Sequence, residues 1–223
     1  MANRSRDIIA HIDASPSPYT ADAPAGSKVT FHWHHTGSCG GGEDGWDCSH
    51  HGFTATYLAS CNGDCKNVDK TKLEFFKIHE SALIDYRPGR FSQGEKKTQS
   101  GYWATDAIFY DQGGAQSVTI PKGIPSGNYV LRTEVMSVHN NGDVSRRQFW
   151  PQCFNVKVTG GSDGAKVPAG KKGTELYSAN DALLKWDIYW HEADKTFPTA
   201  PGPALASVAS FKVRRNHPKD FVL

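Results

Sequence analysis

The 223-residue chain is long enough for one β-domain with a full core, and its 22 glycines and 12 prolines favour turn-rich β-structure over a helical bundle. Its 25 basic and 23 acidic residues give a formal net charge of +2, which argues against nucleic acid as a partner. The sequence contains no apolar run long enough to cross a bilayer, so no membrane contact is expected.

Alternation of apolar and polar residues predicts a series of short strands separated by Gly, Pro and Asn turns. The predicted strands, in chain order, span residues 28–35, 52–61, 73–83, 117–124, 126–139 and 152–160. Residues 1–26 are polar and proline-rich, and predict an irregular arm or one weak strand, while 100–110 predict a short turn or helix. This succession of strands is typical of an all-β, two-sheet sandwich.

We expect a single domain over residues 1–223, because no repeat and no linker divides the chain. Its core is expected at about residues 27–205, followed by a C-terminal tail at 206–223. An aromatic cluster at residues 183–190 stands in the less regular part that precedes this tail.

Five cysteines point to an oxidising compartment. Cys61 and Cys65 flank Asn-Gly-Asp, a turn that can bring two thiols within bridging distance, and Cys39 and Cys48 flank a glycine-rich loop that can close in the same way. Cys153 is left over, which predicts either a lost partner or a free buried thiol. The first residues contain no apolar core of signal-peptide length, so the chain is either not secreted or lacks its upstream part, and the cysteines favour the latter.

Several segments, in one order, resemble the lytic polysaccharide monooxygenases of auxiliary activity family 9, formerly glycoside hydrolase family 61. These segments are AGSKVTFHW, SHHGF with YLASCNGDC, DKTKLEFFKIHESALID, YWATDAI, VTIPKGIPSGNYVLRTEVMSVH, QFWPQCFNVKVTG, and DIYW with PGPAL. The resemblance covers roughly residues 25 to 205. It implies an immunoglobulin-like or fibronectin-like antiparallel β-sandwich with long loops, secreted by a fungus. It also implies copper-dependent oxidative cleavage of cellulose or related β-1,4-glucans with an external electron donor, and we expect a monomer.

The resemblance also implies a copper ligand. Family members hold one copper ion between the amine and ring of an N-terminal histidine and a second histidine, found in a His-x-Gly-Pro motif. The matching stretch here is HHGF, which implies His50 as the ligand, with His51 as an alternative. Nitrogen ligands of this kind suit Cu(II). The chain begins Met1-Ala2-Asn3, so we expect an atypical or N-terminally truncated member, with the copper weakly bound.

Other histidines are candidates to complete such a site. His34 and His35, at the end of the first predicted strand, could lie close to His50, and His11 lies in the arm. His34 faces away from the apolar side of its strand, so the simpler interpretation is an exposed polar position. The competing function is a non-catalytic relative that binds β-glucan or metal and has lost the copper site.

The resemblance assigns further roles near the copper and on the substrate face. His139 and Gln148 match the pair that hydrogen-bonds an oxygen species near the metal, and Trp150 stands at the axial position, where the family has tyrosine. An indole offers only an N–H donor and no lone pair for a metal. Phe197 and Tyr189 are the candidates for stacking on sugar rings. In the family, Cys153 pairs with a cysteine that this chain lacks, so pairing of Cys153 with Cys39 or Cys48 is the alternative.

Overall fold

The computed structural model describes residues 6–34, 46–47, 49–85, 101–139, 144–186, 188 and 199–209. The strands are β1 (Ala21–Asp22), β2 (Lys28–His32), β3 (Gly52–Ser60), β4 (Glu74–Ser81), β5 (Leu83–Asp85), β6 (Tyr102–Trp103), β7 (Ala115–Thr119), β8 (Gly127–Ser137), β9 (Gln148–Val158) and β10 (Lys171–Lys172). The helices are α1 (Asp7–Ala10), α2 (Ala104–Tyr110) and α3 (Ala182–Lys185), with single 3-10 turns η2 (Cys65–Asn67), η3 (Lys70–Lys72), η4 (Val144–Arg146) and η5 (Gly173–Glu175).

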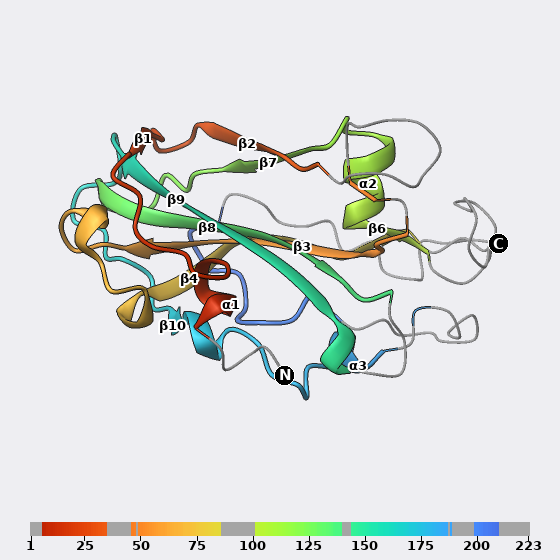
Figure 1. Ribbon diagram of the computed structural model, residues 1–223. Helices are drawn as coiled ribbons and strands as arrows, with labels where there is room; N and C mark the ends of the chain where they lie inside the picture. Colours follow the sequence, from red (N-terminus) through yellow and green to blue (C-terminus); the bar gives the residue numbers. More distant parts are fainter. Residues whose placement is uncertain are drawn as a thin grey trace.

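A six-stranded sheet in the order β1-β9-β8-β3-β4-β10 forms the main layer, and the β2–β7 pair lies along one side of it (Figure 1). A further two-stranded sheet joins β5 to β6. The pairings are antiparallel except for the short β1, which runs parallel to β9. The expected β-sandwich is therefore confirmed, with one parallel edge strand that the sequence did not predict.

Both faces of the main sheet are buried, so nearly every residue of the central strands β3 and β8 is buried. Along β3, Phe53 and Tyr57 pack into a core cluster on the side of α1 and α3, whereas Leu58 packs into the second cluster with Phe31 of β2. Successive side chains of a strand point to opposite faces, so one strand supplies both cores. No helix in the described part of the chain is long and apolar enough to cross a membrane.

The N-terminal segment is better ordered than its polar composition predicts. Besides the weak strand β1, it contains α1, where Ile8 and Ile9 are 4% and 1% exposed. Elsewhere, the predicted strand at 73–83 is divided into β4 and β5, and the helix predicted within 100–110 is α2. The expectation for residues 210–223 of the tail falls outside the described residues.

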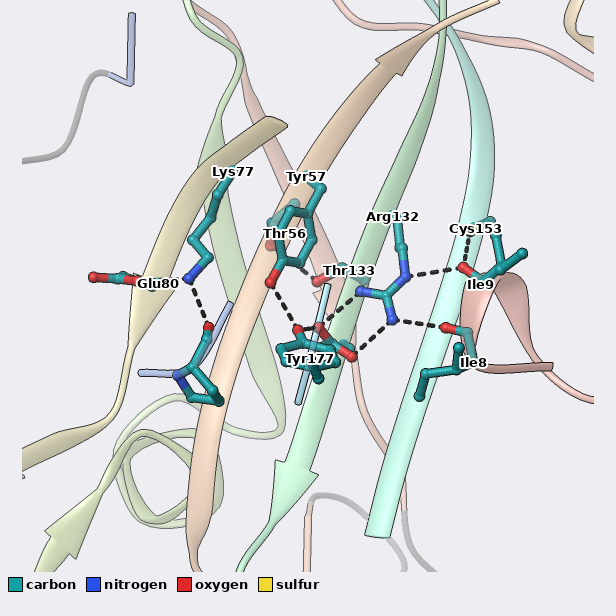
Figure 2. A network of polar contacts seen from close by, with 12 residues as sticks. Ile8, Ile9, Thr56, Tyr57, Lys77, Glu80, Arg132, Thr133, Cys153 and Tyr177 are labelled. Atoms are coloured by element: carbon teal, nitrogen blue, oxygen red, sulfur yellow. Dashed lines mark hydrogen bonds and ion pairs between the residues drawn. The ribbon is translucent and has the colours of Figure 1, made fainter. Parts of the chain in front are cut away.

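A buried polar network links α1 and Pro201 to the main sheet (Figure 2). Arg132 of β8 is fully buried and forms a two-pronged ion pair with Glu134, with N–O distances of 2.7 and 2.9 Å. Its remaining N–H groups donate to the carbonyls of Ile8 and Ile9 at 2.9 Å. On β4, the buried Lys77 donates to the carbonyl of Pro201 at 2.8 Å. A buried charge of this kind is tolerated only when paired and hydrogen-bonded.

The cysteines divide into bridged and free. Cys61 and Cys65 form the disulfide predicted from their Asn-Gly-Asp turn. Cys153 is a free thiol that donates to the carbonyl of Ile9, so the alternative pairing of Cys153 with Cys39 or Cys48 is wrong. Burial raises the pKa of the Cys153 thiol to about 12. Cys39 and Cys48 themselves lie outside the described residues, and their mutual bridge stays a prediction.

Candidate functional site

His50 stands just before β3, at the end of a short turn that begins at Trp46. Asp47, whose side chain is 2% exposed, accepts hydrogen bonds at Oδ1 from the amide and the hydroxyl of Ser49, each at 2.7 Å. The Nδ1 atom of His50 lies 3.1 Å from Asp47 Oδ1 and 3.1 Å from Ser49 Oγ. The Trp46 indole donates to the carbonyl of His50 at 3.2 Å. Side chains within this segment therefore hydrogen-bond to one another and to its backbone.

The ends of β8 and β9 bring two further predicted residues to His50. The ring of His139, two residues beyond β8, has its centroid 4.3 Å from that of His50. The ring centroid of Trp150 in β9 lies 5.6 Å from that of His50. The Trp150 indole also packs edge-on against Trp46, with ring centroids 4.9 Å apart. Gln148 lies on the same face of β9 as Trp150, because the two positions are i and i+2 along the strand.

Gln148 carries an unusual feature for a native protein. Its Oε1 atom is buried and has no hydrogen-bond partner among the described residues. Buried polar atoms are normally paired, and leaving one unpaired costs about 1–3 kcal/mol. Gln148 pairs across the sheet with Ser137, two residues before His139, so this acceptor belongs to the same end of β8 and β9 as the His50–His139 pair.

The charges at the site favour a neutral His139 and an ionised Asp47. Burial, followed by the nearby His50 and His51, lowers the pKa of His139 to about 4, and its Nδ1 contacts the Ser137 hydroxyl. Burial alone would raise the pKa of Asp47, but the hydrogen bonds from Ser49 and His50 lower it to about 2. At neutral pH the site therefore combines one buried carboxylate with an uncharged imidazole.

His51, the alternative ligand, is engaged on another element. Its Nδ1 lies 2.8 Å from Oδ1 of Asp106, and the second oxygen of Asp106 accepts from the amide of Trp103 at the start of α2. Thr105 of α2 accepts from the amide of Gly52 at 2.8 Å. The two adjacent histidines thus have separate carboxylate partners, and α2 holds the His51–Gly52 peptide in place.

Two of the remaining candidates are exposed histidines. His34 and His11 are both exposed, and His34 lies beyond the end of β2, opposite in direction to the buried Phe31 and Trp33. His35, Tyr189 and Phe197 lie outside the described residues. Within the described residues, no group of three or more His, Cys, Asp and Glu side chains is arranged to hold a metal ion.

Sequence reasoning missed Asp47 and Ser49 as partners of His50. The signal was nonetheless present, since an acidic residue three positions before a histidine, with a serine between them, can close a local hydrogen-bonded turn.

The fold is that of solved lytic polysaccharide monooxygenases. The structure superposes on the extended catalytic domain of H. jecorina LPMO9A with a TM-score of 0.75 and 35% identity, covering 92% of this chain and 72% of that one. It superposes on Cel61B from Hypocrea jecorina with a TM-score of 0.74 and 32% identity, covering 92% and 78%.

The family assignment follows from the sequence comparisons. The model of Auxiliary Activity family 9 (formerly GH61) matches residues 1–197. An AA9 lytic polysaccharide monooxygenase from Aspergillus oryzae is 41% identical over 204 residues, covering 92% of this chain and 72% of the relative. Another from Aspergillus fumigatus is 41% identical over 202 residues, covering 91% and 71%. The chain belongs to Auxiliary Activity family 9, and this membership supports oxidative cleavage of polysaccharides as its general activity.

Copper, the metal that this family implies, fits the donor chemistry of the described residues in part. His50 supplies one imidazole, a ligand type that suits copper. The carboxylate on its Nδ1 side is the usual support for a metal-binding histidine. The unpaired Oε1 of Gln148 and the neutral His139 complete a polar surrounding.

Proposed function

We propose that this protein binds one copper ion through His50 and uses it to cleave cellulose or a related β-1,4-glucan oxidatively. The observation that carries the proposal is the convergence of His50 and His139, with ring centroids 4.3 Å apart, and it is supported by the buried Oε1 of Gln148, a residue that pairs with Ser137 at the same end of β8. Copper, when bound, supplies redox chemistry with an oxygen co-substrate that protein side chains lack. An external donor provides the electrons.

The chain's own residues have distinct roles in this proposal. His50 binds the metal, while His139 and Gln148 offer hydrogen-bonding groups to a small oxygen species beside it. Trp150, whose ring centroid lies 5.6 Å from that of His50, contributes an apolar surface to the site. It is not a metal ligand, because an indole has no lone pair for a metal. Phe197 and Tyr189 are the proposed sugar-stacking rings, and we propose secretion because the Cys61–Cys65 disulfide suits an oxidising compartment.

A second candidate is a non-catalytic relative that binds β-glucan or metal. Two observations favour it. The described residues contain no group of three metal-ligating side chains, and an indole occupies the position where the family's tyrosine would supply an oxygen. The two proposals predict the same binding but different products, so they can be separated by experiment.

The test combines metal binding with product analysis on this chain. Cu(II) is titrated by calorimetry and followed by electron paramagnetic resonance for the parent, His50→Ala and His34→Ala, the last being a matched control at an exposed histidine. We expect weak copper binding in the parent and in His34→Ala, and its loss in His50→Ala. Unchanged binding in His50→Ala would show that His50 is not the ligand.

Product analysis uses swollen cellulose incubated with the copper-loaded protein and ascorbate, followed by mass spectrometry of released oligosaccharides. Oxidised products that depend on the reductant and disappear in His50→Ala support the monooxygenase. Copper binding and sedimentation with cellulose, without oxidised products, would favour the non-catalytic relative instead.

A further inference from the structure

We infer that Asp47 and Ser49 are positioning residues that hold His50 in its Nδ1–H tautomer, so that Nε2 carries the lone pair. The consequence for metal binding rests on the proposed role of His50 as the ligand. The tautomer itself follows from the hydrogen-bond geometry of the turn alone.

The argument begins with the hydroxyl hydrogen of Ser49. A hydroxyl has one hydrogen to donate, and the 2.7 Å contact with Asp47 Oδ1 uses it, since a carboxylate can only accept. Toward His50, the Ser49 oxygen can then only accept. The contact between Ser49 Oγ and His50 Nδ1, at 3.1 Å, therefore requires a hydrogen on the ring nitrogen.

The carboxylate leads to the same assignment independently. Asp47 Oδ1 lies 3.1 Å from His50 Nδ1, and an unprotonated ring nitrogen there would place two lone pairs against each other. If the Ser49 hydroxyl instead donated to His50, Asp47 Oδ1 would keep only the Ser49 amide as a donor and would still face that repulsion. A neutral imidazole has one N–H and one lone pair, so Nε2 is left as the basic nitrogen.

The surrounding packing keeps the ring in this orientation. The His50 amide donates to the Asp47 carbonyl at 3.2 Å, and the Trp46 indole donates to the His50 carbonyl at 3.2 Å. The ring itself packs against His139 and Trp150. A ring flip would replace the Nδ1–H bond by a C–H group facing Asp47, whose side chain is 2% exposed and has little access to water.

This arrangement prepares His50 for a cation before any cation arrives. A metal requires the unprotonated ring nitrogen, and a carboxylate behind the ring both selects the tautomer and increases the basicity of the ligand. Removing such a partner typically weakens metal affinity about 10–100-fold. His51, which has its own carboxylate partner in Asp106 at 2.8 Å, provides an internal control in the same molecule.

The experiment measures long-range ¹H–¹⁵N correlations of the histidine rings in the metal-free protein at about pH 8, where an ordinary imidazole is neutral. We expect His50 to show a protonated Nδ1 and a lone pair on Nε2. In the double variant Asp47→Ala with Ser49→Ala, His50 should move toward the Nε2–H form, whereas in Ser49→Ala, where Asp47 still faces Nδ1, the shift should be smaller. The His51 signals should stay in place, which also reports that the fold is intact.

A parent His50 in the Nε2–H form, or an Nδ1–H form that persists in the double variant, would overturn the inference. Copper titration adds the second readout, with affinity expected to fall about 10–100-fold in the double variant and less in Ser49→Ala. The failures are distinguishable. A parent that binds no copper defeats the proposed function and leaves the tautomer result standing, whereas copper binding through an Nε2–H parent ring would defeat this inference alone.

Discussion

Replacing Glu134 with glutamine should strongly destabilise the protein, because it leaves the fully buried Arg132 without its charged partner. The guanidinium forms two bonds of 2.7 and 2.9 Å to the Glu134 carboxylate, and its other acceptors, the carbonyls of Ile8 and Ile9, are uncharged. Breaking a buried pair by removing one charge costs about 3–5 kcal/mol. For a domain of this size, a loss of about 3 kcal/mol lowers the melting temperature by roughly 6–12 °C.

Urea unfolding, followed by both circular dichroism and tryptophan fluorescence, measures this cost. The Lys66–Asp64 pair, whose side chains are 56% and 49% exposed, supplies a control, since Asp64→Asn should barely change stability. The double variant Arg132→Met with Glu134→Leu should be more stable than Glu134→Gln, because it removes both charges together. A single variant that costs less than about 1 kcal/mol would refute this account of the network.

Three further results are expected. Iodoacetamide should modify Cys153 far more slowly in the native protein at pH 8 than after unfolding, because burial raises the pKa of this thiol to about 12. Burial lowers the pKa of His79, so the unfolded chain binds a proton at higher pH than the folded protein, and the unfolding free energy should fall as the pH drops below about 6.5. In urea unfolding measured at a series of pH values, His79→Gln should show a smaller loss of unfolding free energy over this range. Gly202→Ala should lower the unfolding free energy by about 1–3 kcal/mol in the same assay, since its φ is +92° and a Cβ would lie 3.1 Å from Leu176 O and Tyr57 Oη.

The strands of the main sheet were predictable because burial leaves a periodic trace in the sequence. β3 and β8 alternate between apolar and polar residues over much of their length, and their predicted limits differ from the observed ones by at most two residues at each end. The helix α1 left no such trace. Its burial depends on Ile8 and Ile9 meeting the side chain of Arg132, more than 120 residues away, and a local pattern cannot express that contact.

The candidate site was predictable to the extent that family motifs mark it. His50, His139 and Trp150 were found from the resemblance, and the structure brings their rings together. What the motifs could not supply is the orientation of His50, because it depends on which atoms its two ring nitrogens meet. The difference between His50 and the adjacent His51 arises from separate partners on separate elements, and only coordinates show those partners.

The buried polar network around Arg132 and Lys77 links segments near both ends of the described chain to the sheet that carries the candidate site. Arg132 of β8 holds α1, and Lys77 of β4 donates to the carbonyl of Pro201 (Figure 2). The backbone of Lys77 also forms a β-bridge with Leu205. The hydroxyl of Tyr57 in β3 meets that of Tyr177 at 2.7 Å between these two anchors. β3 begins two residues after His50 and β8 ends two residues before His139, so these two strands, which carry Tyr57 and Arg132 of the network, also set the distance between the two histidine rings. A buried polar network is costly unless the hydrogen-bonding groups of every member are paired. The paired groups of Arg132, Glu134 and Lys77 therefore stabilise the strands whose rigidity the site requires.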